Sequence, residues 1–202
     1  MGAMSDIPVL TTDRLVLRAP EPQDYPDFKA TFSSYRSRFM GGPLNAYEAW
    51  MLYAAEIGHW DIRGFGMWMI HARDDDRTLG MAGGWQPAGW PEREIAWIIW
   101  PKAAGQGYAL EATDAARRFF YRQHGWDGAV SYVDPKHLDS IRLCERLGAR
   151  RDPDAASVDG NDVVYRHPAP ADLRDTRLAW AIAREIAHYA DPKLKPEGAP
   201  VD

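Results

Sequence analysis

Alternating polar and apolar residues mark the first structured segments of the chain. Residues 12–18 (TDRLVLR) alternate in this way and predict a strand. A helix is predicted over 23–32, where Asp24 near the start suits the positive end of the helix dipole. Asn45 predicts the N-cap of a second helix, which runs from 46 to about 60.

The middle of the chain predicts a β-hairpin followed by a buried strand. Apolar runs over 68–72 and 78–84 flank a charged turn at 73–77, which is typical of a hairpin. A Pro/Gly loop at 86–91 follows. The apolar run 94–100 (EIAWIIW) then predicts a strand that is buried on both faces.

Helices and strands continue to alternate in the second half. A glycine-rich segment at 102–108 leads into a predicted helix over 108–124. A strand over 129–133 and a short helix over 140–147 follow, and Gly148 is the expected helix stop. This order of elements predicts an α/β fold.

The last predicted strand covers 163–166, and two prolines after it mark a boundary. An amphipathic stretch at 172–189 predicts a further helix for packing or for a homodimer contact. The predicted organisation is an N-terminal tail at 1–10 that is partly vector-derived, a domain at 11–168, and a C-terminal helical extension and tail at 169–202.

Composition narrows the class of protein. The 202 residues are 46% hydrophobic and 26% charged, which is ordinary for a globular domain. Cys144 is the single cysteine, so no internal disulfide can form and a cytoplasmic location is expected. We find no signal peptide, no apolar run that could span a membrane and no cluster with metal-ligand spacing. The net charge of −5 disfavours nucleic acid as a partner and is compatible with a cationic amine substrate.

The segment between the strand at 94–100 and the next helix carries the chemistry. Gly105 and Gly107 allow a backbone to approach a ligand closely, and the unpaired amides of a helix start favour an anion such as a pyrophosphate. The segment matches neither the P-loop nor the dinucleotide-binding fingerprint. On the two glycines alone, a helix entry without a ligand is the preferred interpretation.

Three blocks in order resemble the GNAT acetyltransferases. Residues 104–109 (AGQGYA), continued by LEA, resemble motif A, and residues 134–149 (DPKHLDSIRLCERLGA) are similar to motif B. TDRLVLR resembles the first strand of the subgroup that acetylates ribosomal-protein N-termini. The resemblance covers about 11–167.

The resemblance implies a mixed, mostly antiparallel sheet, flanked by helices and splayed open at the strand that holds the cosubstrate acetyl-CoA. It also implies a set of cofactor-binding residues: Ile98, Ile99, Trp100, Gly105, Gln106, Gly107, Tyr108, Ala109, His137, Ser140 and Cys144.

Three positions depart from the family pattern. Ala104 stands where Gln or Arg is usual, which removes one phosphate contact. His137 replaces the usual Asn, and it is either a cofactor contact or a solvated loop histidine. Cys144 replaces a tyrosine acid, and a small buried residue is the preferred interpretation of it over a nucleophile.

By the resemblance, Glu94 is the general base and Ser140 protonates the leaving thiolate. The alternatives are that Glu94 is an exposed strand-edge residue, that Glu92 is the base, and that Ser140 caps a helix. The amides of Ile98 and Ile99 are expected near the oxyanion.

Tryptophans gather where the acceptor would lie. Trp68, Trp85, Trp90 and Trp97 belong to this region, and Trp90 in the Pro/Gly loop is the favoured pocket residue. Core packing is the preferred interpretation for Trp97 and Trp100.

The sequence therefore predicts an N-acetyltransferase that moves an acetyl group from acetyl-CoA to a primary amine in a ternary complex. The acceptor is left open among a ribosomal N-terminus, an amino acid, a polyamine and an antibiotic. The alternatives are a longer acyl-CoA, O-acylation, and a catalytically silent CoA-binding regulator.

Overall fold

The computed structural model describes residues 7–74 and 77–173. The chain divides into two compact units, 1–170 and 171–202. The predicted helix at 172–189 lies almost wholly outside the described residues, so it stays a prediction. No helix among the described residues is long and apolar enough to cross a membrane.

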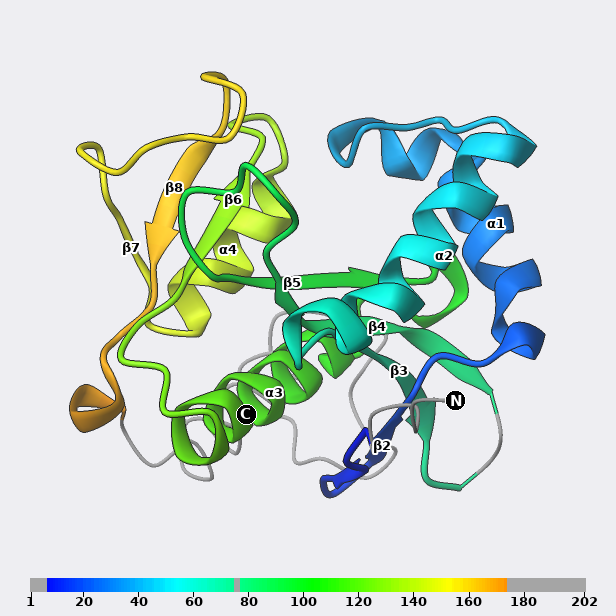
Figure 1. Ribbon diagram of the computed structural model, residues 1–202, viewed down its shortest axis with the longest axis horizontal. Helices are drawn as coiled ribbons and strands as arrows, with labels where there is room; N and C mark the ends of the chain where they lie inside the picture. Colours follow the sequence, from blue (N-terminus) through cyan, green and yellow to red (C-terminus); the bar gives the residue numbers. More distant parts are fainter. Residues whose placement is uncertain (1–6, 75–76, 174–202) are drawn as a thin grey trace, which may run out of the picture. The chain divides into compact units, whose positions relative to one another are not determined.

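One eight-stranded sheet forms the first unit (Figure 1), with the strand order β1-β2-β3-β4-β5-β6-β8-β7. The strands are β1 (Leu10–Thr11), β2 (Leu15–Arg18), β3 (Met67–Ala72), β4 (Thr78–Trp85), β5 (Glu94–Ile99), β6 (Val130–Val133), β7 (Arg150–Arg151) and β8 (Val163–Arg166). The helices are α1 (Tyr25–Phe32), α2 (Ala46–Arg63), α3 (Tyr108–Gln123) and α4 (Leu138–Arg146), with short 3-10 turns that include η2 (Tyr35–Phe39).

The sheet opens between β5 and β6. Every neighbouring pair of strands is antiparallel except this one, which is parallel and matches at a single position, Glu94 with Val130. Beyond that position the two strands diverge in Figure 1. The predicted mixed, mostly antiparallel and splayed sheet is confirmed.

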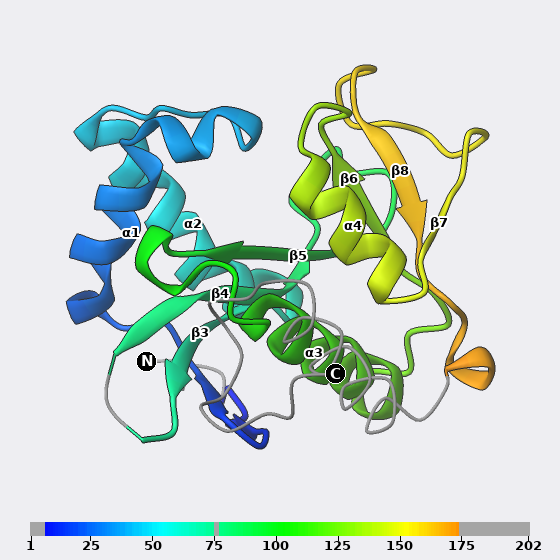
Figure 2. The same cartoon turned by 180° about the vertical axis from the view of Figure 1, so that it is seen from behind.

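Helices cover both faces of the sheet, and the alternation of side chains along a strand explains how. Met67 and Met69 of β3 face a cluster that includes Phe28 of α1 and Tyr53 of α2. Trp68, between them, points to the other face and contacts rings of α3. Figure 2 shows α3 and α4 from that second side.

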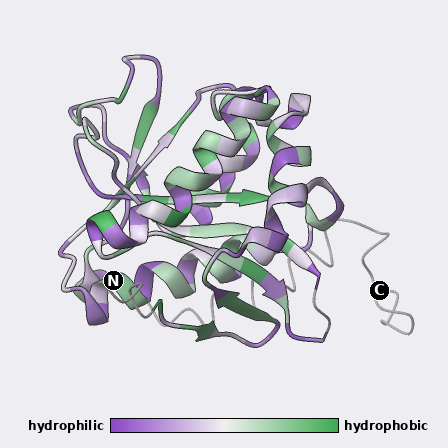
Figure 3. Ribbon diagram, turned by 45° about the vertical axis from the view of Figure 1, so that its right-hand side comes forward, coloured by the Kyte–Doolittle hydropathy of each residue, from purple (hydrophilic) through white to green (hydrophobic). Residues whose placement is uncertain are grey.

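Hydrophobic residues are concentrated in the strands and recur along the helices that cover them, whereas the outer loops are mostly hydrophilic (Figure 3). A separate hydrophobic cluster joins α4 to β6 and β8 through Cys144, Val133 and Tyr165. Each arm of the open sheet therefore has its own packed core, which fixes the walls of the opening.

Most predicted elements are present, and the differences are local. The strand predicted over 12–18 begins at Leu15, because residues 12–14 turn so that Thr12 and Arg14 can bind Glu111 of α3. The helix predicted over 140–147 begins at Leu138, so Ser140 lies inside its first turn. The N-cap interpretation of Ser140 is therefore wrong. The two-residue strands β1 and β7 were too short to predict.

Candidate functional site

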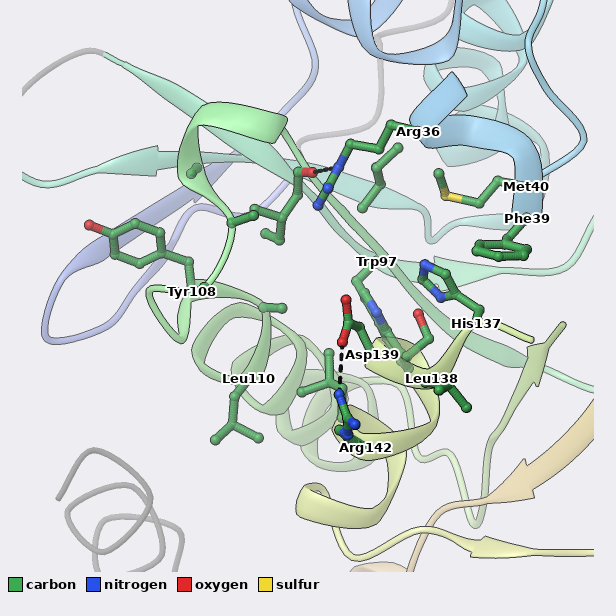
Figure 4. Close-up of a pocket in the computed structure, with 18 of the residues that line it drawn as sticks. Arg36, Phe39, Met40, Trp97, Tyr108, Leu110, His137, Leu138, Asp139 and Arg142 are labelled. Carbon is green, nitrogen blue, oxygen red and sulfur yellow. Dashed lines mark hydrogen bonds and ion pairs between the residues drawn. The ribbon is translucent and has the colours of Figure 1, made fainter. Parts of the chain in front are cut away.

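Two cavities lie along β5. The first, of about 600 Å³, is drawn in Figure 4, and the second has about 610 Å³. Both are as large as typical small-molecule sites. They share seven lining residues, which form a junction between them: Arg38, Phe39, Met40, Trp97, Ile98, His137 and Ser140.

The glycine-rich loop forms one end of the first cavity. Gly105 and Gly107 both line it, and both have φ of +78°, which favours glycine over any residue with a Cβ. Gly107 is the residue before α3, so the amides of the first turn of α3 have no partner within the helix. An anion bound here would accept hydrogen bonds from those amides.

Arg14 fastens this loop to the N-terminal strand. Its guanidinium lies 2.6 Å from the carboxylate of Glu111, donates to the Gln106 carbonyl at 3.0 Å, and lies 4.7 Å from the Tyr108 ring centre. Glu111 is fully buried, and the Thr12 hydroxyl and the Arg14 amide also donate to it. The TDR segment thus holds the loop and the start of α3 together.

Cationic side chains dominate the first cavity. Asp139 is the one acidic side chain among its described lining residues, and Arg142 neutralises it at 3.2 Å (Figure 4). The cations come from η2 and from α4 with the turn before it: Arg36, Arg38, Lys136, Arg142 and Arg146. They supply the positive charge that Ala104, which lines the same cavity, lacks.

The free backbone edge of β5 faces the opening. A methyl group built on Gly80 of β4 would collide with the Ile98 carbonyl oxygen, so that carbonyl points toward β4. Successive carbonyls alternate along a strand, so the amides and carbonyls of Trp97 and Ile99 point away from β4. In agreement, the Arg36 guanidinium donates to the Ile99 carbonyl at 3.0 Å (Figure 4).

Carboxylates dominate the second cavity. Arg38 is the one Lys or Arg among its described lining residues. Its acidic lining residues come from α2, from the start of β5, and from the segments that follow β6 and precede β8: Glu56, Glu94, Asp134, Asp159 and Asp162. The two cavities therefore have opposite charge.

Glu94 is buried at the start of β5. It accepts a hydrogen bond from the Trp90 indole at 2.8 Å. Burial raises the pKa of Glu94 to about 8, although the Trp90 hydrogen bond opposes this. Its rival Glu92 instead makes two contacts with Arg166, at 2.8 and 2.9 Å, and lines neither cavity. Of Glu92 and Glu94, Glu94 is thus the one that can exchange a proton near neutral pH inside a cavity.

Glu56 is a second buried carboxylate in the same cavity. Burial, and then the charge of Glu94, raise the pKa of Glu56 to about 8. Its Oε2 atom has no hydrogen-bond partner among the described residues. The sequence reasoning missed Glu56, but a signal exists: it is the one charged member of the α2 face formed by Ala49, Tyr53, Glu56 and Trp60.

The junction brings Ser140 and His137 to the point where the cavities meet. Ser140 is buried, and 9% of its surface is exposed. His137 is half-buried, and its ring centre lies 4.7 Å from that of Phe39, so it is not a solvated loop histidine. Ile98, Ile99, Gly105, Gly107, Tyr108 and Ala109 also line the first cavity, although the main-chain groups of Ile98 point toward β4 and not into the opening.

Three residues of that set lie elsewhere. Gln106 is exposed and lines neither cavity, and Trp100 is buried in the core, as its core-packing interpretation predicts. Cys144 is fully buried, and burial raises the pKa of its thiol to about 12, so it lacks the accessible thiolate of a nucleophile.

The tryptophans divide differently from the expectation. Trp85 and Trp90 line the second cavity, and Trp97 lines both cavities while it also packs against the cluster of Val133 and Cys144. Trp97 is half-buried: β4 pairs with it on one side, but β6 has already diverged from β5 on the other. Trp68 is fully buried against Trp60 and the rings of α3, away from the acceptor side.

Comparison with known proteins places this geometry in context. Residues 14–150 match the model of the acetyltransferase (GNAT) domain. An N-acetyltransferase of Bacillus subtilis, YnaD, described as uncharacterized, is 26% identical over 80 residues, which is 40% of this chain and 47% of that protein. The chain thus spans about half the length of this curated relative.

Solved structures share the fold. The crystal structure of an acetyltransferase from Agrobacterium tumefaciens C58 has a TM-score of 0.78 and 32% identity, covering 81% of this chain and 95% of that one. A ribosomal L7/L12 α-N-protein acetyltransferase, RimL, in complex with coenzyme A has a TM-score of 0.66 and 16% identity, covering 82% and 100%.

Proposed function

Because the chain belongs to the GNAT acetyltransferase family and carries its acyl-CoA-dependent domain, we propose that it acetylates a primary amine by direct attack in a ternary complex. Acetyl-CoA supplies the thioester and binds in the first cavity. The amine enters from the second cavity and meets the thioester at the junction. The observation that carries this proposal is the pair of cavities of opposite charge that join at Ser140.

The first cavity fits the cosubstrate. The free amides at the start of α3 and the cations of η2 and α4 bind phosphate oxygens, and the free edge of β5 at Trp97 pairs with an amide-bearing chain. The Ile99 amide would also stabilise the oxyanion that forms when the amine attacks the carbonyl carbon.

Glu94 acts as the general base. An amine is an ammonium ion at neutral pH and becomes a nucleophile only after it loses a proton. Glu94 accepts that proton, and the pKa of about 8 that burial gives it matches this task.

Ser140 completes the reaction at the junction. When the carbon–sulfur bond breaks, the Ser140 hydroxyl donates its proton to the thiolate and takes up the second proton that the attacking nitrogen loses, so that the hydroxyl is restored. An acyl-cysteine intermediate has no part in this mechanism, because the chain's single cysteine, Cys144, is fully buried.

The test combines binding and turnover. Calorimetry should give an acetyl-CoA Kd of about 1 μM or tighter for both the parent protein and Glu94→Gln. Thiol release with an amine acceptor should fall by about 100-fold or more in Glu94→Gln, because the base is lost without a change of shape.

The matched control is Glu145→Gln, the same chemical change at an exposed position of α4 outside both cavities. It should keep full turnover. Equal activity of Glu94→Gln would remove Glu94 as the base. Binding of acetyl-CoA without turnover of any amine would indicate a silent CoA-binding protein.

A further inference from the structure

Buried carboxylates in this protein usually have an arginine partner. Of the five buried acidic residues among those described, three are paired: Glu111 with Arg14 at 2.6 Å, Asp24 with Arg18 at 2.8 Å, and Asp114 with Arg117 at 2.7 Å. The other two are Glu56 and Glu94, and both line the second cavity.

No cation of the described chain compensates these two. Neither carboxylate forms an ion pair within residues 7–74 and 77–173, and Oε2 of Glu56 makes no hydrogen bond there. Burial raises the pKa of both groups to about 8, so each holds a proton at neutral pH, and a cation that enters the cavity favours the ionised form of both. The described residues contain no cluster that could hold a metal ion.

Three aspartates line the same cavity and add negative charge to it. Asp134 follows β6, and Asp159 and Asp162 precede β8. Their charges influence one another, since Asp159 and then Asp134 add to burial in raising the pKa of Asp162, which in turn acts on Glu94. A cationic molecule is therefore attracted along the whole length of the cavity.

We propose that the acceptor is a small aliphatic amine with at least two positive charges, whose reacting amino group lies beside Glu94 and whose second cationic group binds Glu56. This assignment rests on the proposed function and goes beyond it, because a general base alone requires one carboxylate. The three aspartates steer the dication inward. Trp85 and Trp90 line the same cavity and present aromatic rings, which favour alkylammonium groups.

The charge pattern separates this class from the other amines. A free amino acid would bring its own carboxylate into a cavity that is already acidic. A peptide N-terminus with neutral side chains carries one charge and would leave Glu56 without a partner.

The experiment compares two acceptors of equal length, 1,4-diaminobutane and 4-amino-1-butanol, in which a hydroxyl replaces the second ammonium. Thiol release from acetyl-CoA should give a kcat/KM about 100-fold higher for the diamine. Glu56→Gln should reduce that ratio by about tenfold or more, because it removes the charge that binds the second ammonium. Both acceptors use the same base, so any effect of the substitution on Glu94 changes both values of kcat/KM equally and leaves their ratio unchanged.

A second variant covers the case in which Glu56→Gln does not fold. The double variant carries Asp159→Asn, at an exposed loop position, and Asp162→Asn, at a partly exposed one. It should also lower the ratio of kcat/KM for the diamine to that for the amino alcohol. The matched control is Asp154→Asn, at an exposed position outside both cavities, with an unchanged ratio.

The assignment would be overturned by an equal kcat/KM for the two acceptors. It would also be overturned if alaninamide, which stands for a peptide N-terminus with one charge, were turned over better than the diamine. A ratio that neither Glu56→Gln nor the double variant changes would overturn it too. Failure of the proposed function looks different, because then no amine is turned over at all, whatever its charge.

Discussion

The two cavities beside β5 have almost the same volume, but they differ in the sign of their charge and in how deeply the charged groups are buried. The first is lined by main-chain amides and by cations of which all but Arg36 are exposed, so most of its charge is hydrated. The second holds two carboxylates buried without a cationic partner among the described residues. Charge at a surface contributes little for each contact, whereas a buried unpaired charge responds strongly to whatever binds it. We therefore expect general anion affinity in the first cavity and selectivity in the second.

The largest effect should come from the backbone of the first cavity. Gly105→Val places a β-branched residue at φ +78°, which strains the loop and moves the amides that bind phosphate. The acetyl-CoA Kd measured by calorimetry should rise about 100-fold. Gly125→Val is the control, because Gly125 has φ +62° and open space around it, yet lies outside both cavities. Similar affinity in both variants would show that the loop does not hold the cosubstrate.

A smaller effect should follow from removing charge on the same side. Lys136→Gln combined with Arg146→Gln should raise the acetyl-CoA Kd about tenfold at low ionic strength, and the difference should shrink as salt is added. The control pair Lys29→Gln and Arg122→Gln removes two exposed cations outside both cavities and should change nothing. A loss of affinity that persists at high salt would argue against a purely electrostatic role.

The smallest effect concerns the pH dependence set in the second cavity. Glu94 can accept a proton only when ionised, so kcat/KM should rise with pH through its pKa of about 8. Trp90→Phe removes a hydrogen bond that favours the ionised form, and the rising limb should move upward by about 1 pH unit.

The control for that shift is Trp50→Phe on the exposed surface of α2, measured with the same amine so that the acceptor's own ionisation is common to both. If the rise of kcat/KM with pH is unchanged in Trp90→Phe, a group other than Glu94 sets the pH dependence.

The sequence predicted what is local and missed what depends on distant segments. The strand at 94–99 and the glycine loop were predicted because apolar runs and glycines act on their own neighbourhood. The cationic wall was not, because η2 and α4 lie about 100 residues apart along the chain. Glu56 was missed since helical periodicity shows which face is buried, not what that face surrounds.

Trp97 illustrates the same limit. Its place in an apolar strand predicted a core residue, and every residue of a central strand in an ordinary sheet would be one. The single matched position between β5 and β6 leaves Trp97 with a strand neighbour on the β4 side only, and nothing in the local sequence reports that divergence.

That divergence also gives the sheet two inner edges in addition to the outer edges at β1 and β7. A bare strand edge is a template on which another protein chain can pair and aggregate. Here the guanidinium of Arg36 occupies the Ile99 carbonyl, and Pro101 follows just after β5, where a proline cannot continue strand pairing. Two copies that approached edge to edge would also bring their cationic walls together. We therefore expect the cationic residues of the first cavity to oppose the pairing of two copies at the open edge of the sheet.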